Sequence, residues 1–214
     1  MTISIVIVDD HAIMREGLSQ VLAQQPDLTV AGTSGDSRQS LKLIGELRPD
    51  VVILDISMPG LNGIEVARQV RERWPACAVV MLSMHASSEY VFQAMEAGAR
   101  GYLQKESSAR DIVDAVRAVK AGRRYLGPGI AEVVADHLAT RKPGDNPLEL
   151  LSRREREILQ LVAEGHSSAE IGTLLFLSPK TVDSYRSRLM AKLALADIPA
   201  LVKFAIRHGV IPLD

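Results

Sequence analysis

The stretch that decides the fold is VVILDISMPG, residues 51–60, in which an apolar run ends at Asp55 and the chain then turns at Pro59-Gly60. Such a run fits a strand that is buried on both faces, as the strands of parallel sheets are. A carboxylate at the end of this strand falls at the sheet edge where open α/β proteins bind their ligands. The other polar groups that reach the same edge therefore decide what the protein can do.

The strand-then-helix pattern around Asp55 recurs along the first 122 residues. Short apolar runs alternate with segments of helical spacing. The predicted strands are ISIVIV (3–8), LTVAGT (28–33), VVILD (51–55), AVVMLS (78–83) and RGYLQK (100–105). Alternation of this kind favours parallel strands with helices on both faces. We therefore predict a doubly wound α/β domain at residues 1–122, with a five-stranded parallel sheet of (βα)5 type.

The remainder of the chain changes character. Gly127, Pro128 and Gly129 interrupt the pattern, so residues 123–147 are expected to form a linker with one short helix. Residues 148–214 have helical spacing throughout and predict a small all-α domain of four helices, two of which form a helix-turn-helix. The capping signals are Ser152 with Glu155, Ser178 with Pro179, and Asp197 with Pro199.

The composition excludes several classes of protein. Lys and Arg number 25 against 26 for Asp and Glu, so any nucleic-acid contact must come from a local basic surface. Cys77 is the one cysteine, which excludes an internal disulfide and a thiolate metal cage. The apolar runs are too short to span a membrane. We expect a soluble, cytoplasmic protein without a membrane partner.

Polar side chains follow four of the predicted strands. They are Asp9, Asp10, Asp55, Ser83 and Lys105. Clustered carboxylates repel one another unless a cation joins them, and oxygen ligands suit Mg²⁺, which also favours phosphate partners. We therefore predict a Mg²⁺ site in which Asp55 is the nucleophile for a phosphoryl group and Lys105 pairs with the phosphoryl oxygens.

At these residues the sequence resembles the receiver domain of two-component response regulators. The matching segments are Asp9-Asp10, LDISMPGLNG (54–63), MLS (81–83) and GARGYLQK (98–105). The resemblance implies phosphorylation of Asp55 by a histidine kinase. It also implies a metal site made by Asp9 or Asp10, Asp55 and the main-chain carbonyl of Ser57, and switching through Ser83 and Tyr102. Glu106 stands where many receivers have Pro, which affects the following loop and not the chemistry.

The predicted helix at 179–193 has two distinct faces. At 100° per residue, one stripe is apolar and is expected in the core: Val182, Tyr185, Leu189 and Leu193. The opposite face has small or polar residues, Lys180, Ser184, Ser187 and Ala191, flanked by Thr181, Asp183 and Arg188. Small side chains let a helix approach a groove floor, while basic residues at its edges contact phosphates.

The stretch from Leu151 to Leu193 resembles the LuxR/NarL-type DNA-binding domain, whose third helix enters the major groove. By position, the groove-facing candidates are Thr181, Asp183, Ser184, Ser187 and Arg188, and the phosphate-contacting candidates are Lys180, Arg186 and Lys192. Asp183 stands where the family commonly has Lys, and Ser168 where Asn is common. An acidic residue in the groove could accept a hydrogen bond from a cytosine amino group.

Both halves together resemble a NarL/FixJ-type response regulator. We expect a transcriptional regulator that binds promoter DNA as a phosphorylation-linked dimer and is not an enzyme. A haloacid-dehalogenase-like hydrolase would need a second Asp where Ser57 stands, and no G-x-G-x-x-G follows any strand to bind a dinucleotide. The alternative is a regulator of the same architecture whose receiver serves only as a dimerisation module, without phosphorylation.

Overall fold

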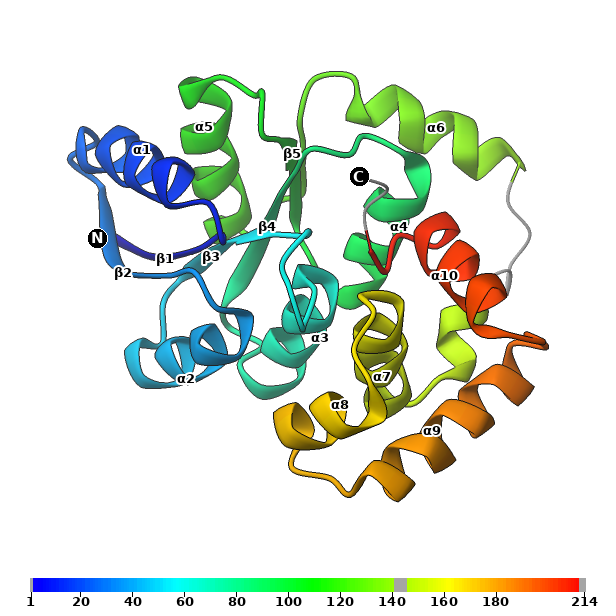
Figure 1. Cartoon of the computed structure of the whole chain (residues 1–214). Helices are drawn as coiled ribbons and strands as arrows, with labels where there is room; N and C mark the ends of the chain where they lie inside the picture. The colour runs from blue at the N-terminus through cyan, green and yellow to red at the C-terminus, as the bar shows by residue number, and fades with distance from the viewer. Residues whose placement is uncertain (1, 141–145, 212–214) are drawn as a thin grey trace. The chain divides into compact units, whose positions relative to one another are not determined.

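The computed structural model describes residues 2–140 and 146–211. The chain forms two compact units, Met1–Thr140 and Arg141–Asp214 (Figure 1). The first unit is a parallel sheet with helices on both faces, and the second consists of helices. An α/β domain followed by a helical domain is the class that the sequence predicts.

The sheet of the first unit has six parallel strands in the order β2-β1-β3-β4-β5-β6. Their bounds are β1 Ile3–Val8, β2 Leu28–Ser34, β3 Val51–Asp55, β4 Ala78–Ser83, β5 Gly101–Gln104 and β6 Tyr125–Leu126. The prediction of five strands is therefore wrong in number. The sixth strand, β6, pairs with Gly101 and Tyr102 of β5. Two residues are too short to show an alternating pattern, and the turn residues that follow β6 suggested a linker.

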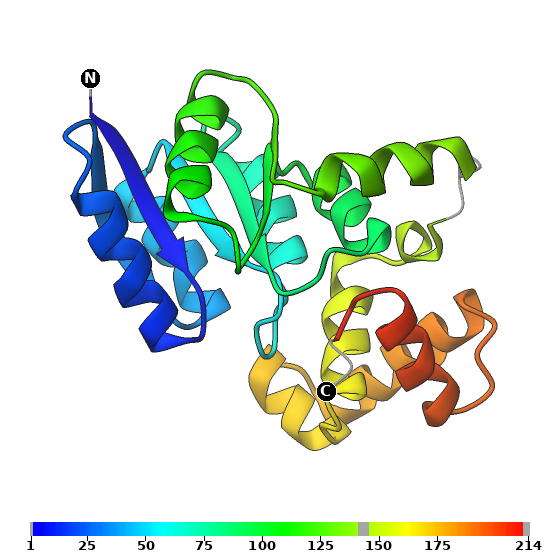
Figure 2. The ribbon, with the colours of Figure 1, turned by 90° about the horizontal axis from the view of Figure 1, so that it is seen from above.

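Five helices cover the two faces of the sheet. Their bounds are α1 Ala12–Ala23, α2 Ser37–Leu47, α3 Gly63–Arg73, α4 Ser88–Ala97 and α5 Ala109–Lys120. One face of the sheet packs on α1 and α5, and the other on α2, α3 and α4, as Figure 2 shows. Side chains alternate between the two cores along each strand, so that Ile5 and Ile7 of β1 enter one core and Val6 and Val8 the other. This burial on both faces accounts for the continuous apolar runs in the sequence.

A sixth helix, α6, spans Ile130–Thr140 and packs against α4. Ile130 at its start is fully buried in the same core as α3 and α4, and Val134 is partly buried there. Residues 123–140 thus add a strand and a helix to the first compact unit. The domain limits at residues 122 and 148 stay predictions.

The second unit contains a short 3-10 helix, η1 Pro147–Leu150, and four α-helices. Their bounds are α7 Arg153–Ala163, α8 Ser168–Leu175, α9 Pro179–Lys192 and α10 Ile198–Arg207. The predicted caps are confirmed, since Ser152 and Glu155 form a capping box and the side chains of Ser178 and Asp197 accept main-chain N–H groups of α9 and α10. Helix α9 packs on α7 and α8. None of the helices in the described ranges is long and apolar enough to cross a membrane.

Candidate functional site

The first candidate site lies at the carboxyl edge of the sheet, where the strand order reverses between β1 and β3. Asp9 follows β1, Asp55 ends β3, Ser83 ends β4 and Lys105 follows β5. In an open α/β sheet the loops on either side of such a reversal diverge and leave room for a ligand. The topology thus brings together residues that are far apart in the sequence.

Lys105 joins the carboxylates of two strands. Its Nζ lies 2.8 Å from Oδ2 of Asp55 and 2.8 Å from Oδ2 of Asp9. All three side chains are almost completely buried. Buried charges are tolerated only when they are paired, so the ammonium holds both carboxylates at the sheet edge.

Burial and pairing have opposite effects on the pKa values of Asp55 and Lys105. Burial raises the pKa of Asp55, and the hydrogen bond from Lys105 offsets this only in part, while the negative charge of Asp9 raises it further. For Lys105, burial works to lower the pKa, but the hydrogen bonds to Asp55 and Asp9 outweigh it and the pKa rises. Lys105 is therefore a cation, and the charge on Asp55 depends on its neighbours.

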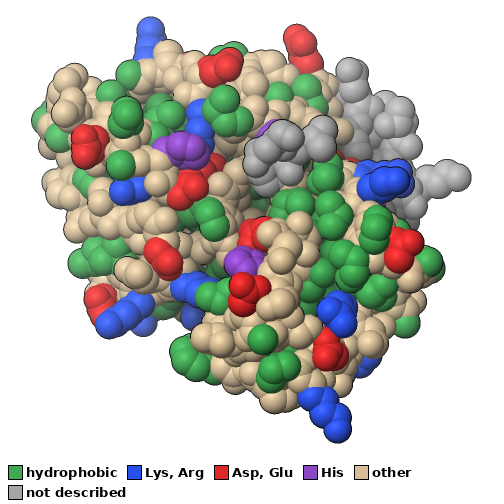
Figure 3. Space-filling model, viewed as in Figure 1, with side chains coloured by type: hydrophobic (Ala, Val, Ile, Leu, Met, Phe, Trp, Pro, Cys, Tyr) green, Lys and Arg blue, Asp and Glu red, His purple; other side chains and the backbone are tan. Residues whose placement is uncertain are grey.

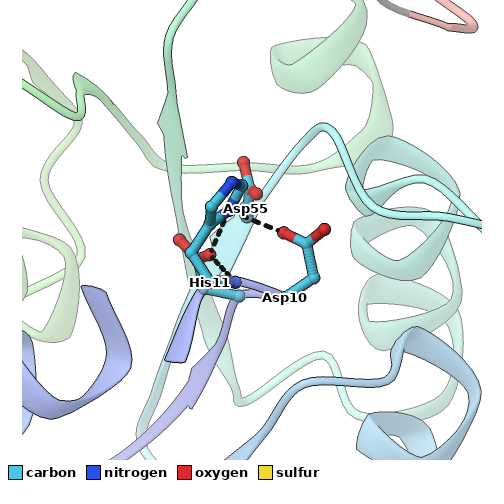
Figure 4. Close-up of side chains that lie close together, drawn as sticks. Asp10, His11 and Asp55 are labelled. Carbon is cyan, nitrogen blue, oxygen red and sulfur yellow. Dashed lines mark hydrogen bonds and ion pairs between the residues drawn. The ribbon is translucent and has the colours of Figure 1, made fainter. Parts of the chain in front are cut away.

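His11, which directly follows Asp9 and Asp10, is also part of this site. Its main-chain N–H donates to Oδ1 of Asp9 at 2.8 Å, and its Nδ1 lies 3.1 Å from the same oxygen and 2.8 Å from Oδ1 of Asp10. Figure 4 shows the side chains of Asp10, His11 and Asp55 gathered at the ends of β1 and β3. The imidazole is exposed to solvent. A single His after two Asp residues gave no sequence signal for this arrangement.

The donor set of this cluster fits a divalent cation. Asp9, Asp10, His11 and Asp55 each offer a ligand atom, and these atoms lie within 4.8 Å of one another. Three carboxylates against the one ammonium of Lys105 leave an excess of negative charge in a largely buried place, which a cation relieves. Carboxylate oxygens suit Mg²⁺. The N–H of Ser57 donates to Oδ1 of Asp55 at 3.2 Å, which places this residue directly beside the cluster.

Ser83 and Tyr102 both hold the main chain of His85, in the loop between β4 and α4. The Ser83 Oγ accepts the N–H of His85 at 3.0 Å, and the Tyr102 hydroxyl donates to the His85 carbonyl at 2.7 Å. Tyr102 is fully buried, and burial raises the pKa of its phenol, so it remains a neutral donor. The His85 ring stacks on Tyr90, with ring centroids 4.6 Å apart. Neighbouring Met84 is 61% exposed, because it lies in this loop beyond the end of β4.

The second candidate site is helix α9 in the helical unit. Val182 and Leu189 are fully buried, and Tyr185 and Leu193 pack against the same core, which confirms the predicted apolar stripe. The opposite face is exposed at Lys180, Ser184, Ser187 and Ala191. Charges of both signs are scattered over the face of the molecule seen in Figure 3, in keeping with a net charge of −1. Any attraction for a polyanion must therefore come from a local basic surface and not from the charge of the whole molecule.

The basic residues of α9 differ in their partners. Arg186 lies 3.0 Å from the Asp183 carboxylate, and Lys192 donates to Glu155 at 2.7 Å. The Arg188 guanidinium lies 4.5 Å from the centre of the Tyr185 ring. Within the described ranges, Lys180 and Arg188 have no acidic partner. These two residues are therefore the cations of α9 that are most available to an external anion.

Comparison with known protein families identifies the two parts of the chain. The model of the response regulator receiver domain matches residues 5–117, and that of the bacterial regulatory proteins of the luxR family matches residues 149–205. This chain belongs to the response regulators. It is a two-component response regulator with a LuxR-type DNA-binding domain, as the sequence motifs indicated.

Individual relatives span nearly the whole regulator. The response regulator GacA of Pseudomonas aeruginosa is 37% identical over 209 residues, which cover 98% of each chain. The oxygen regulatory protein NreC of Staphylococcus epidermidis is 36% identical, covering 95% of this chain and 96% of that protein. The sequence similarity of these proteins to this chain thus extends over both units and the segment between them.

Solved structures of other response regulators are similar as well. A LuxR-family response regulator from an Aurantimonas species has a TM-score of 0.62 and 36% identity, covering 65% of this chain and 99% of that one. A complex of the response regulator RcsB with DNA has a TM-score of 0.61 and 25% identity, covering 95% of this chain and 98% of that one.

Proposed function

We propose that this response regulator accepts a phosphoryl group on Asp55 from a histidine kinase and, once phosphorylated, binds promoter DNA as a dimer. The observation that carries the proposal is the contact of Lys105 with both Asp55 and Asp9 at 2.8 Å. It sets an acceptor carboxylate, a cation for the incoming phosphoryl oxygens and a second carboxylate for a metal ion beside one another.

In the proposed transfer, an Asp55 carboxylate oxygen forms a bond to phosphorus. The phosphorus–nitrogen bond of the donor phosphohistidine breaks, and its electron pair leaves with the imidazole. Lys105 then exchanges its contact with Asp55 for the phosphoryl oxygens, a shift that its flexible stem allows. The N–H of Ser57 keeps its hydrogen bond to Asp55 and so maintains the orientation of the acceptor.

Asp9, Asp10 and Asp55 would hold Mg²⁺, together with the main-chain carbonyl of Ser57. When bound, the ion neutralises charge between the carboxylate and the phosphoryl oxygens. The support is the close approach of the ligand atoms and the excess negative charge around them. His11 contacts two of these carboxylates and would keep them oriented for the ion.

The switch would act through Ser83 and Tyr102. A phosphoryl group on Asp55 adds about two negative charges and strong acceptors, toward which the Ser83 hydroxyl can donate. Because Ser83 and Tyr102 both bond to the main chain of His85, a shift of Ser83 alters a loop that Tyr102 also holds. Tyr102 is already buried here, so the proposed change lies in the loop from Met84 to Ser87 and in α4.

In the DNA-binding unit, α9 would lie in the major groove. Its small exposed residues permit close approach, with Thr181, Asp183, Ser184, Ser187 and Arg188 toward the bases and Lys180 toward phosphate. Arg186 and Lys192, which were expected on phosphates, already have carboxylate partners. A dimer on paired half-sites doubles the contacts that one small domain can make.

The experiment uses the full-length protein with acetyl phosphate and MgCl₂, and measures phosphoryl incorporation by mass spectrometry, mass by light scattering, and DNA binding by gel shift. We expect the wild type to incorporate a phosphoryl group, to double its mass and to bind DNA, and we expect Asp55→Asn to do none of these. Asp114→Asn, which removes an exposed carboxylate on α5, is the matched control. Full dimerisation and DNA binding by Asp55→Asn would refute the proposal and favour a receiver that acts only as a dimerisation module.

A further inference from the structure

Three polar side chains connect α8 to α9 in a way that the sequence does not reveal. The Ser168 hydroxyl at the start of α8 donates to Oδ1 of Asp183 at 2.6 Å. The Nη2 of Arg186 lies 3.0 Å from the same oxygen, and its Nη1 donates to the Ser168 Oγ at 3.3 Å. The three side chains thus form a closed triangle of contacts, which we name the Ser168–Asp183–Arg186 triad.

The triad leaves one carboxylate oxygen available. Both contacts with Asp183 fall on Oδ1, and in the described part of the chain Oδ2 has no hydrogen-bond partner. The Asp183 side chain is 50% exposed. A carboxylate held at one oxygen and exposed at the other is an acceptor whose direction is largely set before any ligand arrives, which reduces the entropy lost on binding.

The triad also removes the main obstacle to an acidic residue in a DNA groove. A lone carboxylate would repel the phosphates on both sides of the groove. The guanidinium of Arg186 neutralises Asp183 within one turn of the same helix. Next to Asp183 lies the exposed face with Ser184 and Ser187, whose small side chains would let the base edges come near.

Base chemistry selects the partner of such an acceptor. In the major groove, guanine presents two acceptors and thymine an acceptor and a methyl group, so both are unsuitable for a carboxylate. Adenine presents an amino donor beside the N7 acceptor, which repels the second lone pair of the carboxylate. Cytosine presents only its N4 amino donor.

We propose that Asp183, positioned by Ser168 and Arg186, recognises the N4 amino group of a cytosine in each half-site of the target DNA. This inference rests on the proposed function of α9 as the groove-binding helix. Ser168 and Arg186 are positioning residues, since they act on the base through Asp183. The competing explanation is that the triad only fastens α8 to α9, which would affect stability and leave base preference unchanged.

The test is selection of bound sequences from a random double-stranded DNA library by the full-length protein with acetyl phosphate and MgCl₂. The wild type is expected to enrich a motif with a cytosine at one position of each half-site, preferred about 5- to 150-fold over other bases. Asp183→Asn should change the preference at that position to adenine, because an amide pairs with adenine N6 and N7. Asp183→Ala should lose the preference there and keep the rest of the motif.

Further variants separate positioning from structure. Ser168→Ala should weaken the cytosine preference several-fold at the same position only. Glu149→Gln removes one exposed negative charge from the same unit and should leave the motif unchanged. Thermal unfolding of every variant shows whether it is folded.

The outcomes distinguish the two proposals. If the wild type enriches a motif that Asp183→Asn and Asp183→Ala enrich equally, the triad is only structural and this inference is overturned while the proposed DNA binding stands. If the wild type enriches no motif at all, the proposed function of α9 fails as well.

Discussion

Lys192 donates to Oε2 of Glu155 over 2.7 Å and so fastens the last turn of α9 to the first turn of α7. Glu155 is almost fully buried and also accepts from the hydroxyl and N–H of Ser152 in the capping box. A lysine that the sequence placed on DNA phosphate therefore has a structural partner. Lys180, at the other end of α9, has no acidic partner among the residues described.

The two lysines should behave differently when each is truncated. Lys192→Ala leaves a buried carboxylate without its cation. A buried group that loses its partner typically costs about 1–3 kcal/mol of stability. We expect a loss of about 1 kcal/mol for the helical unit, because the Lys192 side chain is partly exposed to solvent. Lys180→Ala should leave stability unchanged and lower the slope of log affinity against log salt by about 1. Thermal unfolding and DNA titrations between 50 and 200 mM salt, about the range in which such slopes are measured, separate the two effects. If Lys192→Ala and Lys180→Ala changed stability and salt dependence equally, the structural role of Lys192 and the DNA-contacting role of Lys180 would both be contradicted.

The contacts of Glu155 also predict that the stability of the helical unit depends on pH. Burial works to raise the pKa of Glu155, but hydrogen bonds from Lys192 and Ser152 outweigh it, so the pKa lies below its ordinary value of 4.5. A carboxyl whose folded pKa is depressed stabilises the fold above the unfolded pKa, and this contribution is lost as the pH falls through the folded pKa. Hydrogen exchange of α7 and α9 amides should show wild type more protected than Glu155→Gln at pH 7. The difference should shrink below about pH 4.5 and vanish once Glu155 is protonated. A constant difference at all pH values would show that charge is not involved.

Removal of Lys105 should separate metal binding from phosphoryl transfer. Without the ammonium, Asp9 and Asp55 lose their positive partner, so we expect Lys105→Met to bind Mg²⁺ about tenfold more tightly. Phosphorylation by acetyl phosphate should slow, because no cation receives the phosphoryl oxygens. Calorimetric titration with MgCl₂ and mass spectrometry give the two readouts. Asp10→Asn should have the opposite effect on metal affinity, and unchanged Mg²⁺ binding in both variants would place the ion elsewhere.

Gly63 lies at the start of α3, close to the end of β3 where Asp55 stands. A Cβ at Gly63 would lie 1.9 Å from the carbonyl oxygen of Asp55, so Gly63→Ala must displace the end of β3 or the start of α3. We expect a loss of about 1–3 kcal/mol in stability, together with slower phosphorylation. Gly17 in α1 has open space around it, and Gly17→Ala should instead stabilise by about 0.5–1 kcal/mol. Urea unfolding of both variants measures these opposite changes in the free energy of unfolding. If Gly63→Ala left the free energy of unfolding unchanged, the end of β3 would be able to move without cost.

Most of the fold could be predicted because its signals are local. The runs at 3–8, 51–55 and 78–83 are strands at those same residues, since burial on both faces leaves an uninterrupted apolar pattern. The caps at Ser152 and Ser178 were likewise predictable from residue type and spacing. By contrast, β6 has only two residues, and its pairing with β5 depends on a turn after α5 that no periodicity reveals.

The site was predictable where it follows from topology. Asp9, Asp55 and Lys105 meet because parallel strands end at one edge, so their contact follows from the strand pattern. The position of His11 against Asp9 and Asp10 depends on the main-chain turn after β1. The bond from Ser168 to Asp183 depends on the angle between α8 and α9. Neither geometry is encoded in a local pattern of residue types.

The short strand β6 and helix α6 bear on how regulators of this kind can be recombined. A hybrid that joins this receiver to a foreign output domain after residue 122 would lack β6, the last strand of the sheet. The main-chain N–H and C=O groups of β5 would then be exposed and could pair with a strand of another molecule. Splicing after Thr140 keeps that border covered and retains Ile130 in its core position. We therefore expect a hybrid joined after Thr140 to be more stable than one joined after residue 122.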